Sequence, residues 1–293
     1  MIKKLHLTCK DKNNINNETW KRCIEKYREI YNDYEIIIYD NEDIYNIVKS
    51  NFPQHLEKIK QIKIGAVLAD VFRYLILYLE GGIYSDMDCE PLKKIDDLVS
   101  DNHLFFHGGD DNFIYIYPRN KNIINNTCDF YKNICNNCEL QPSHFPIKKY
   151  KCLGHKINNA SVLLSYEYSK DWINYSKELY DSNLKFTRTY NGVCVCQWFM
   201  ISKKPKHRLF LKMYISCTLN IDKLINLDKN NSNFQFYVLN LSGPIAFTKM
   251  IHHNMSDEIF VLPSDFFCCG SWNHSVPQTK NSFVKHHFTS VWI

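Results

Sequence analysis

Long apolar runs are missing from this chain of 293 residues. A membrane-spanning helix needs roughly 20 consecutive apolar residues, and the most apolar window, 71–79, is interrupted by Arg73. The first seven residues contain two lysines but no apolar stretch of the length that a secretory signal requires. The sequence therefore predicts no membrane span and no export, and it favours a cytoplasmic protein.

Blocks of charge of one sign are also missing. The formal net charge is +5, and lysines and arginines are mixed with acidic residues along the chain. This balance gives no indication of a nucleic-acid partner. Apolar residues make up 45% of the chain, which is enough for a sizeable core in one large α/β domain or two small ones.

Twelve cysteines are present, but without a secretion signal they indicate reduced thiols instead of a disulfide framework. The Asn-rich stretch 121–156 combines several of them with histidines. Its cysteines and histidines are Cys128, Cys135, Cys138, His144, Cys152 and His155. Their spacing matches no common zinc finger, so a surface insertion with free thiols is favoured over a zinc site.

Alternating strand-like and helix-like patterns predict an α/β fold. We expect strands at 2–9, 34–39, 83–85, 104–107, 113–117 and 234–241. We expect helices at 17–30, 44–48, 62–80 and 160–180. Such alternation favours a mainly parallel sheet covered on both faces. The aromatic ending, 283–293, is expected to dock on the body of the protein.

A pair of carboxylates follows the strand expected at 83–85. Asp86 and Asp88 are two residues apart, so both side chains would point the same way in an extended segment. Two hard anionic oxygens placed like this suit Mg²⁺ or Mn²⁺ carrying a diphosphate. Because surface loops often contain Asp-x-Asp, the pair indicates a metal site only together with its neighbourhood.

The helix before this pair carries an acid and a base. Asp70 and Arg73 are three residues apart and so share one face of an otherwise apolar helix. A surface ion pair would be worth under about 1 kcal/mol. The alternative is that both side chains face the same pocket as Asp86. The reversal expected at Gly81-Gly82 favours this alternative, since it lets the helix and the strand lie close together.

These residues together resemble the signature of glycosyltransferase family 32. The resemblance rests on Ala69-Asp70-x-x-Arg73-Tyr74-x-x-Leu77-x-x-x-Gly81-Gly82-x-Tyr84-x-Asp86-x-Asp88. Residues 2–6, 242–248 and 286–292 are similar to the family's opening strand, its Gly-Pro segment and its His-His-Trp-x-x-Ser-Trp ending. The family includes fungal α-1,6-mannosyltransferases and capsular-polysaccharide enzymes, and clostridial glucosylating toxins share the pattern more distantly.

The resemblance implies a GT-A fold, which is a Rossmann-like nucleotide-sugar-binding architecture, as a single domain over 1–293. The nucleotide-sugar-binding half would lie at about 1–118, the insertion at about 121–156 and the acceptor-side half at about 157–293. The implied activity is metal-dependent, retaining transfer of a hexose from a UDP- or GDP-sugar to a glycan, a protein or another hydroxyl acceptor. The implied cofactor is Mn²⁺ or Mg²⁺.

The resemblance also implies roles for individual residues. The implied catalytic residues are Asp70, Arg73, Asp86 and Asp88. The implied nucleotide-sugar contacts are His6, Asp70, Arg73, Tyr84, Asp86, Asn159 and Trp292. The implied metal ligands are Asp86, Asp88 and one of His286 and His287, with Asp88 as the direct ligand. Loss of Arg73 is expected to remove activity without unfolding the protein.

The opening strand departs from the family pattern. Leu7 and Cys9 stand where the family usually has Gln and Trp, so the contact to the nucleotide base stays open.

Two other functions share parts of the pattern. Phosphatases of the haloacid dehalogenase type also carry Asp-x-Asp at a strand end but normally follow it with Gly or Thr, whereas Cys89 follows here. A catalytically weak sugar- or nucleotide-binding module of the same fold is the second alternative. Such a module would lose the carboxylates, and both are present in this chain.

Overall fold

The computed structural model describes residues 1–96, 98, 104–108, 113–117, 160–168, 193–254, 258–262, 264–270, 278–279 and 282–289. The chain divides into two compact units. Unit 1 is drawn from 1–91, 195–254 and 287–293, and unit 2 from 92–194 and 255–286. Asn159, Trp292 and the stretch 121–156 lie outside the described residues.

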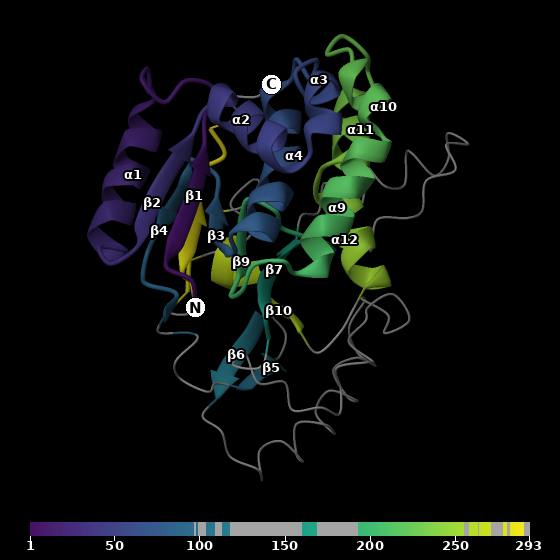
Figure 1. Ribbon diagram of the computed structural model, residues 1–293. Helices are drawn as coiled ribbons and strands as arrows, with labels where there is room; N and C mark the ends of the chain where they lie inside the picture. Colours follow the sequence, from purple (N-terminus) through teal and green to yellow (C-terminus); the bar gives the residue numbers. More distant parts are fainter. Residues whose placement is uncertain are drawn as a thin grey trace. The chain divides into compact units, whose positions relative to one another are not determined.

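A mostly parallel sheet forms the centre of unit 1 (Figure 1). Strand β1 (Lys4–Thr8) pairs in parallel with β2 (Glu35–Tyr39) on one side and with β3 (Gly82–Ser85) on the other. Strand β3 also pairs antiparallel with β9 (Phe199–Ser202). The strands predicted at 2–9, 34–39 and 83–85 are confirmed, and so is a mixed α/β fold with a mainly parallel sheet.

Helices connect these strands. They form where the predicted periodicity of apolar residues coincides with residues that cap a helix. Helix α1 (Glu18–Ile30) is capped by Asn17, and α2 (Asn41–Asn51) by a reciprocal pair of Asp40 and Asp43. The short segments η1 (Pro53–His55) and α3 (Leu56–Ile59) lead into α4 (Gly65–Leu79). The expected helices at 17–30, 44–48 and 62–80 are thus confirmed with shifted ends.

Helix α4 is buried along most of its length and packs against α9 (Arg208–Leu219). After α9 the chain forms α10 (Ile221–Ile225), α11 (Phe234–Leu241) and α12 (Pro244–His253). The short strand β4 (Cys89–Pro91) lies beside α1. None of the helices that the structure describes combines the length and the apolar character that crossing a bilayer requires.

The strand predicted at 234–241 is wrong, because these residues form helix α11. Almost every side chain in the segment is apolar, and a short apolar run does not distinguish a buried helix from a buried strand. Its apparent alternation came from Gln235 between two phenylalanines. The helix ends at Ser242, directly before Gly243.

The helix predicted at 160–180 is also wrong in the part that is described. In unit 2, β7 (Val162–Tyr168) is a strand that pairs in parallel with β10 (Ile259–Leu262). The side chains of 162–165 are completely buried, and a strand buried on both faces shows no alternation to reveal it. Residues 169–180 lie outside the described part of the chain.

Unit 2 also contains the predicted strands at 104–107 and 113–117, which are confirmed as the antiparallel pair β5 (Leu104–Gly108) and β6 (Phe113–Tyr117). Strand β8 (Val193–Val195) spans the point in the sequence where unit 2 gives way to unit 1. Helix α13 (Ser264–Phe267) and β11 (Val284–His286) complete unit 2. The backbone N–H of Phe283 donates to the carbonyl of Phe266 at 2.8 Å, so residues 283–286 of the C-terminal ending are docked in this unit, as expected.

The chain reverses between α4 and β3 at Gly81 and Gly82, whose φ angles are 68° and 85°. Only glycine adopts such angles without strain. A Cβ on Gly82 would lie 2.5 Å from the backbone carbonyl oxygen of Lys4, on the neighbouring strand β1. The reversal therefore requires glycine, and it lets β3 lie directly beside β1.

Gly82→Ala is expected to lower the free energy of unfolding by at least about 1–3 kcal/mol, because strain at a positive φ adds to the clash with the β1 backbone. Gly65→Ala is the matched control, since a Cβ at Gly65 meets nothing within 4 Å. It should change stability by less than about 1 kcal/mol. Urea denaturation measures both variants, and equal unfolding midpoints would contradict this account of the reversal.

Candidate functional site

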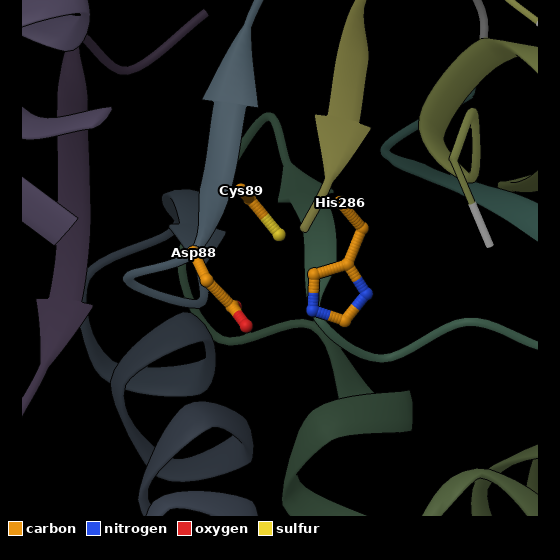
Figure 2. Close-up of side chains that lie close together, drawn as sticks. All are labelled: Asp88, Cys89 and His286. Carbon is orange, nitrogen blue, oxygen red and sulfur yellow. The ribbon is translucent and has the colours of Figure 1, made fainter. Parts of the chain in front are cut away.

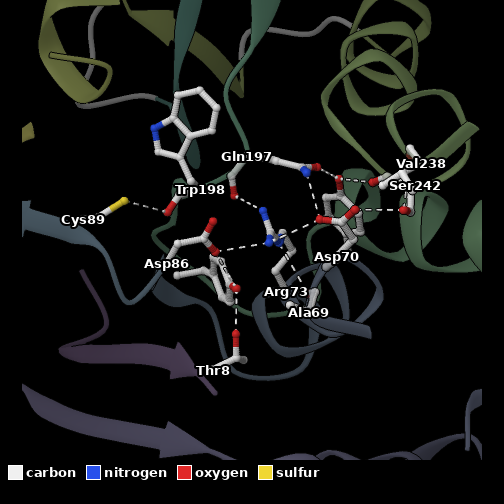
Figure 3. A network of polar contacts seen from close by, with 12 residues as sticks. Thr8, Ala69, Asp70, Arg73, Asp86, Cys89, Gln197, Trp198, Val238 and Ser242 are labelled. Atoms are coloured by element: carbon white, nitrogen blue, oxygen red, sulfur yellow. Dashed lines mark hydrogen bonds and ion pairs between the residues drawn. The ribbon is translucent and has the colours of Figure 1, made fainter. Parts of the chain in front are cut away.

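Arg73 of α4 lies at the centre of a buried polar network in unit 1 (Figure 3). Its Nη2 lies 3.2 Å from Oδ1 of Asp70 and 3.1 Å from Oδ1 of Asp86. The guanidinium group also lies over the ring of Tyr84, 4.8 Å from its centre. Burial alone would lower the pKa of Arg73, but Asp86, Tyr84 and Asp70 together raise it. The cation is therefore permanent.

Asp70 is 3% exposed and is bonded through both carboxylate oxygens. Its Oδ1 accepts from Nε2 of Gln197 at 2.8 Å, and its Oδ2 accepts from the hydroxyl of Ser242 at 2.8 Å. The pair of Asp70 and Arg73 is thus not a surface ion pair. The structure brings Asp70, Arg73 and Asp86 together, as the second interpretation of the sequence expected.

Gln197 and Ser242 are members of this network that the sequence did not indicate. The Gln197 backbone carbonyl accepts from Nη1 of Arg73 at 3.0 Å. The hydroxyl of Tyr74 lies 2.6 Å from Oε1 of Gln197 and 2.9 Å from the carbonyl oxygen of Ser242. Gln197 stands in no motif, whereas Ser242 opens the segment 242–248 that carried part of the family resemblance. That neighbourhood was the one available signal.

The pKa of Asp70 is raised to about 6, mainly because burial disfavours the ionised carboxyl, while Arg73 acts in the opposite direction. The ordinary value, 3.8, applies to the unfolded chain. Between these two values the folded protein binds more protons than the unfolded chain, so the ionisation of Asp70 lowers stability as the pH rises.

The stability of the wild type relative to Asp70→Asn should therefore fall as the pH is raised from about 4 to about 6, and should then stay level. The asparagine variant lacks the ionisation and corrects for all other titrating groups. Urea denaturation of both proteins at several pH values measures the difference. A difference that rises with pH in this window would contradict the assignment.

Asp86 and Asp88 lie in a turn after β3, so the extended conformation predicted for them is wrong. The backbone N–H of Cys89 donates to the carbonyl of Asp86 at 3.1 Å, which closes the turn, and the N–H of Asp86 donates to Trp198 at 2.8 Å. Burial nevertheless alternates, because Met87 is 3% exposed and both aspartates are partly exposed. Figure 2 shows Asp88 and Cys89 where the turn enters β4.

The carboxylate of Asp86 is held by protein donors yet remains open to solvent. The Tyr84 hydroxyl donates to its Oδ1 at 2.9 Å, and the hydroxyl of Thr8 lies 3.0 Å from that of Tyr84. Because Arg73 contacts the same oxygen, the orientation of the carboxylate is fixed. Its side chain is still 28% exposed, so a ligand can reach it.

Residues 287–289 of unit 1 lie against the turn at Asp88. The N–H of His287 donates to the Asp88 carbonyl at 3.0 Å, and Thr289 donates to Oδ2 of Asp88. The ring of His287 turns to Glu90, with Nε2 2.6 Å from Oε2. Glu90 also forms an ion pair with Lys26. The contacts of His287 are thus with the backbone of one aspartate and the side chain of a glutamate.

His286 ends β11, which belongs to unit 2. It is 7% exposed, and its backbone N–H donates to Cys269 at 2.9 Å. The predicted metal-binding role of His286 or His287 stays a prediction.

His6 is completely buried, and both ring nitrogens lie near protein groups. Its Nε2 lies 2.9 Å from the carbonyl oxygen of Gly81, and its Nδ1 lies 3.0 Å from the hydroxyl of Tyr39. Since a carbonyl only accepts, Nε2 carries the proton. Burial lowers the pKa of His6 to about 4, so the ring is neutral at pH 7. His6 therefore ties β1 to the glycine reversal, and its predicted contact with the nucleotide sugar stays a prediction.

The chemistry of the residues at the turn fits a divalent cation. Asp86 and Asp88 offer carboxylate oxygens, the ligands that Mg²⁺ and Mn²⁺ prefer, and both side chains reach solvent. Asp86 already faces the cation Arg73, whereas the two Thr289 donors that hold Oδ2 of Asp88 are neutral. Asp88 is therefore the better candidate for the direct ligand.

Comparison with known proteins points to the same segment. Residues 17–105 match a family described as the glycosyltransferase sugar-binding region containing the DXD motif. An uncharacterised glycosyltransferase of Acanthamoeba polyphaga mimivirus is 45% identical over 62 residues, which are 21% of this chain and 25% of that protein. A mannosyl phosphorylinositol ceramide synthase of Saccharomyces cerevisiae is 32% identical over 83 residues, which are 28% of this chain and 22% of that protein. The alignments thus span about a quarter of these relatives.

The resemblance to DXD-containing glycosyltransferases is confirmed for the segment 17–105. Among solved structures, the glycosyltransferase domain from the YGT toxin is similar with a TM-score of 0.46 and 12% identity, over 89% of this chain and 80% of that one. This TM-score is below 0.5, so the fold class rests on the sheet described above.

Proposed function

We propose, from the premise that residues 17–105 match the sugar-binding region of DXD glycosyltransferases, that this chain transfers a hexose from a UDP- or GDP-sugar to a hydroxyl group of a glycan or protein. The observation that carries the proposal is the buried Arg73, which lies between Asp70 and Asp86. Asp86 lies in the same turn as Asp88, within the matched segment. A permanent cation and two solvent-reaching carboxylates are what a donor with a sugar and a diphosphate requires.

A divalent cation, Mn²⁺ or Mg²⁺, would offset the negative charge that develops on the leaving diphosphate. Asp88 would bind this cation. Asp86, which Arg73 and Tyr84 hold in one orientation, would be shared between the cation and the ribose hydroxyls of the donor. Asp70 would act indirectly, by holding the Arg73 side chain in place.

The family resemblance implies a transfer that keeps the anomeric configuration, and the burial and bonding of Asp70 support a route without a covalent sugar–enzyme intermediate. A nucleophilic carboxylate must reach the anomeric carbon. Asp70 is 3% exposed, and its oxygens are bonded to Arg73, Gln197 and Ser242. It is therefore unsuited to attack, and we propose that the leaving phosphate takes the proton of the acceptor hydroxyl on the same face.

Thermal-shift screening of UDP- and GDP-hexoses with and without Mn²⁺ tests the proposal first. We expect at least one donor to raise the melting temperature only when Mn²⁺ is present, because a ligand that binds the folded state stabilises it. NMR of the product formed from that donor should then show an α-linked sugar. A β-linked product would contradict retention, and binding without any turnover would favour the catalytically weak binding module.

A further inference from the structure

Thr289 joins the N-terminal part of unit 1 to the carboxylate of Asp88. Its backbone N–H donates to Oδ2 of Asp88 at 2.9 Å, and its hydroxyl donates to the same oxygen at 3.0 Å. The indole Nε1 of Trp20, in the first turn of α1, donates to the Thr289 hydroxyl at 3.3 Å. Two donors from one residue thus converge on one oxygen of the expected metal ligand.

The direction of this hydrogen-bond chain is fixed by the chemistry of its ends. An indole N–H only donates, and an ionised carboxylate only accepts. The Thr289 hydroxyl between them must therefore accept from Trp20 and donate to Asp88. A hydroxyl with a settled direction holds its acceptor better than one that can rotate to another partner.

Further contacts keep Thr289 in place. The ring of Phe288 lies edge-on to Trp198, with 5.5 Å between ring centres, and the backbone of His287 donates to the carbonyl of Asp88. The backbone of Trp20 is held in place because its N–H donates to the side chain of Asn17, the cap of α1, at 3.1 Å. The segment 287–289 is thus held both at Asp88 and at α1.

We propose that Thr289, oriented by Trp20, is a positioning residue for Asp88. By occupying Oδ2 with two donors, it directs the other carboxylate oxygen toward a bound divalent cation. The family resemblance assigns this position no role, because 289 falls on one of the undefined residues of the His-His-Trp-x-x-Ser-Trp ending. This inference rests on the proposed function, since it concerns the same cation.

Titration of the full-length protein with Mn²⁺ alone, followed by the electron paramagnetic resonance signal of free Mn²⁺, tests the role of Thr289. Thr289→Val keeps the backbone donor but removes the hydroxyl, and it should weaken Mn²⁺ affinity about 10-fold, the usual size of an outer-shell effect. Thr289→Ser restores the hydroxyl and should bind within about 2-fold of the wild type. Trp20→Phe should fall between them.

Thr218→Val is the matched control, because the Thr218 hydroxyl donates to a backbone carbonyl within α9 and lies outside the site. It should leave Mn²⁺ affinity unchanged. A positioning role also predicts that saturating Mn²⁺ restores the turnover number of Thr289→Val, which a general loss of folding would not allow.

Unchanged Mn²⁺ affinity in Thr289→Val would overturn this inference while leaving the proposed function intact. A turnover defect that persists at saturating Mn²⁺ would overturn it as well. A wild-type protein that neither binds Mn²⁺ nor turns over a donor would instead remove the proposed function, and this inference with it.

Discussion

Asp88→Ala is expected to abolish metal-dependent donor hydrolysis and transfer, by at least about 10³-fold, because no other residue of the pair can replace the direct ligand. Asp86 would contact the same cation but would not replace Asp88, since its Oδ1 is held by Arg73 and Tyr84. The substitution should leave circular dichroism unchanged, because Asp88 is partly exposed in a turn and lies outside the helices and strands of the sheet. Release of nucleoside diphosphate in the presence of Mn²⁺ measures the effect.

Asp228→Ala is the matched control for this experiment. Asp228 is also an exposed aspartate in a turn, where it accepts from the backbone of Asn230, but it lies between α10 and α11. Its loss should leave hydrolysis unchanged. Full activity in Asp88→Ala would show that Asp88 is not the metal ligand.

Arg73→Met is expected to remove activity and also to lower the free energy of unfolding by about 3–5 kcal/mol, since it leaves two carboxylates without their buried cation. The sequence alone suggested a loss of activity without unfolding. The structure changes that expectation, because Arg73 is 4% exposed and bonds to Asp70, Asp86 and Gln197. Urea denaturation and donor hydrolysis measure the two effects separately.

The double variant Asp70→Asn/Arg73→Met should regain part of the lost stability, because it no longer buries an unpaired carboxylate at 70, yet it should remain inactive. Arg28→Met, at an exposed position of α1, is the control and should alter neither property. An Arg73→Met protein as stable as the wild type would contradict the buried network of Figure 3.

The centre of the site was predictable from the sequence because its residues are close together along the chain. Asp70 and Arg73 share a helix face, and the glycine reversal brings that helix back to the strand before Asp86. Gln197 was not predictable, since it enters the network from more than 100 residues away and belongs to no local pattern. Ser242 stands in the segment that resembles the family's Gly-Pro segment, but nothing local to it indicates its bond to Asp70. Thr289 was missed because it stands on an undefined position of the ending at 286–292.

The errors in secondary structure have a common physical cause. The segments 162–168 and 234–241 are both short and apolar, and periodicity is informative only when one side of an element faces solvent. The turn at Asp86 is closed by a local bond, but its first residue is also bonded to Trp198, far along the chain, which no local window could indicate. Tertiary contacts, absent from any local window, decided all three segments.

The most direct test of the central claim is hydrolysis of a panel of UDP- and GDP-hexoses by the wild-type protein, with Mn²⁺, with Mg²⁺ and with a chelator. The account predicts that at least one donor releases its nucleoside diphosphate when a divalent cation is present, and that the chelator stops the release. If every donor stays intact with both cations, or if the chelator leaves the rate unchanged, a metal-dependent sugar transferase at Asp86 and Asp88 is contradicted.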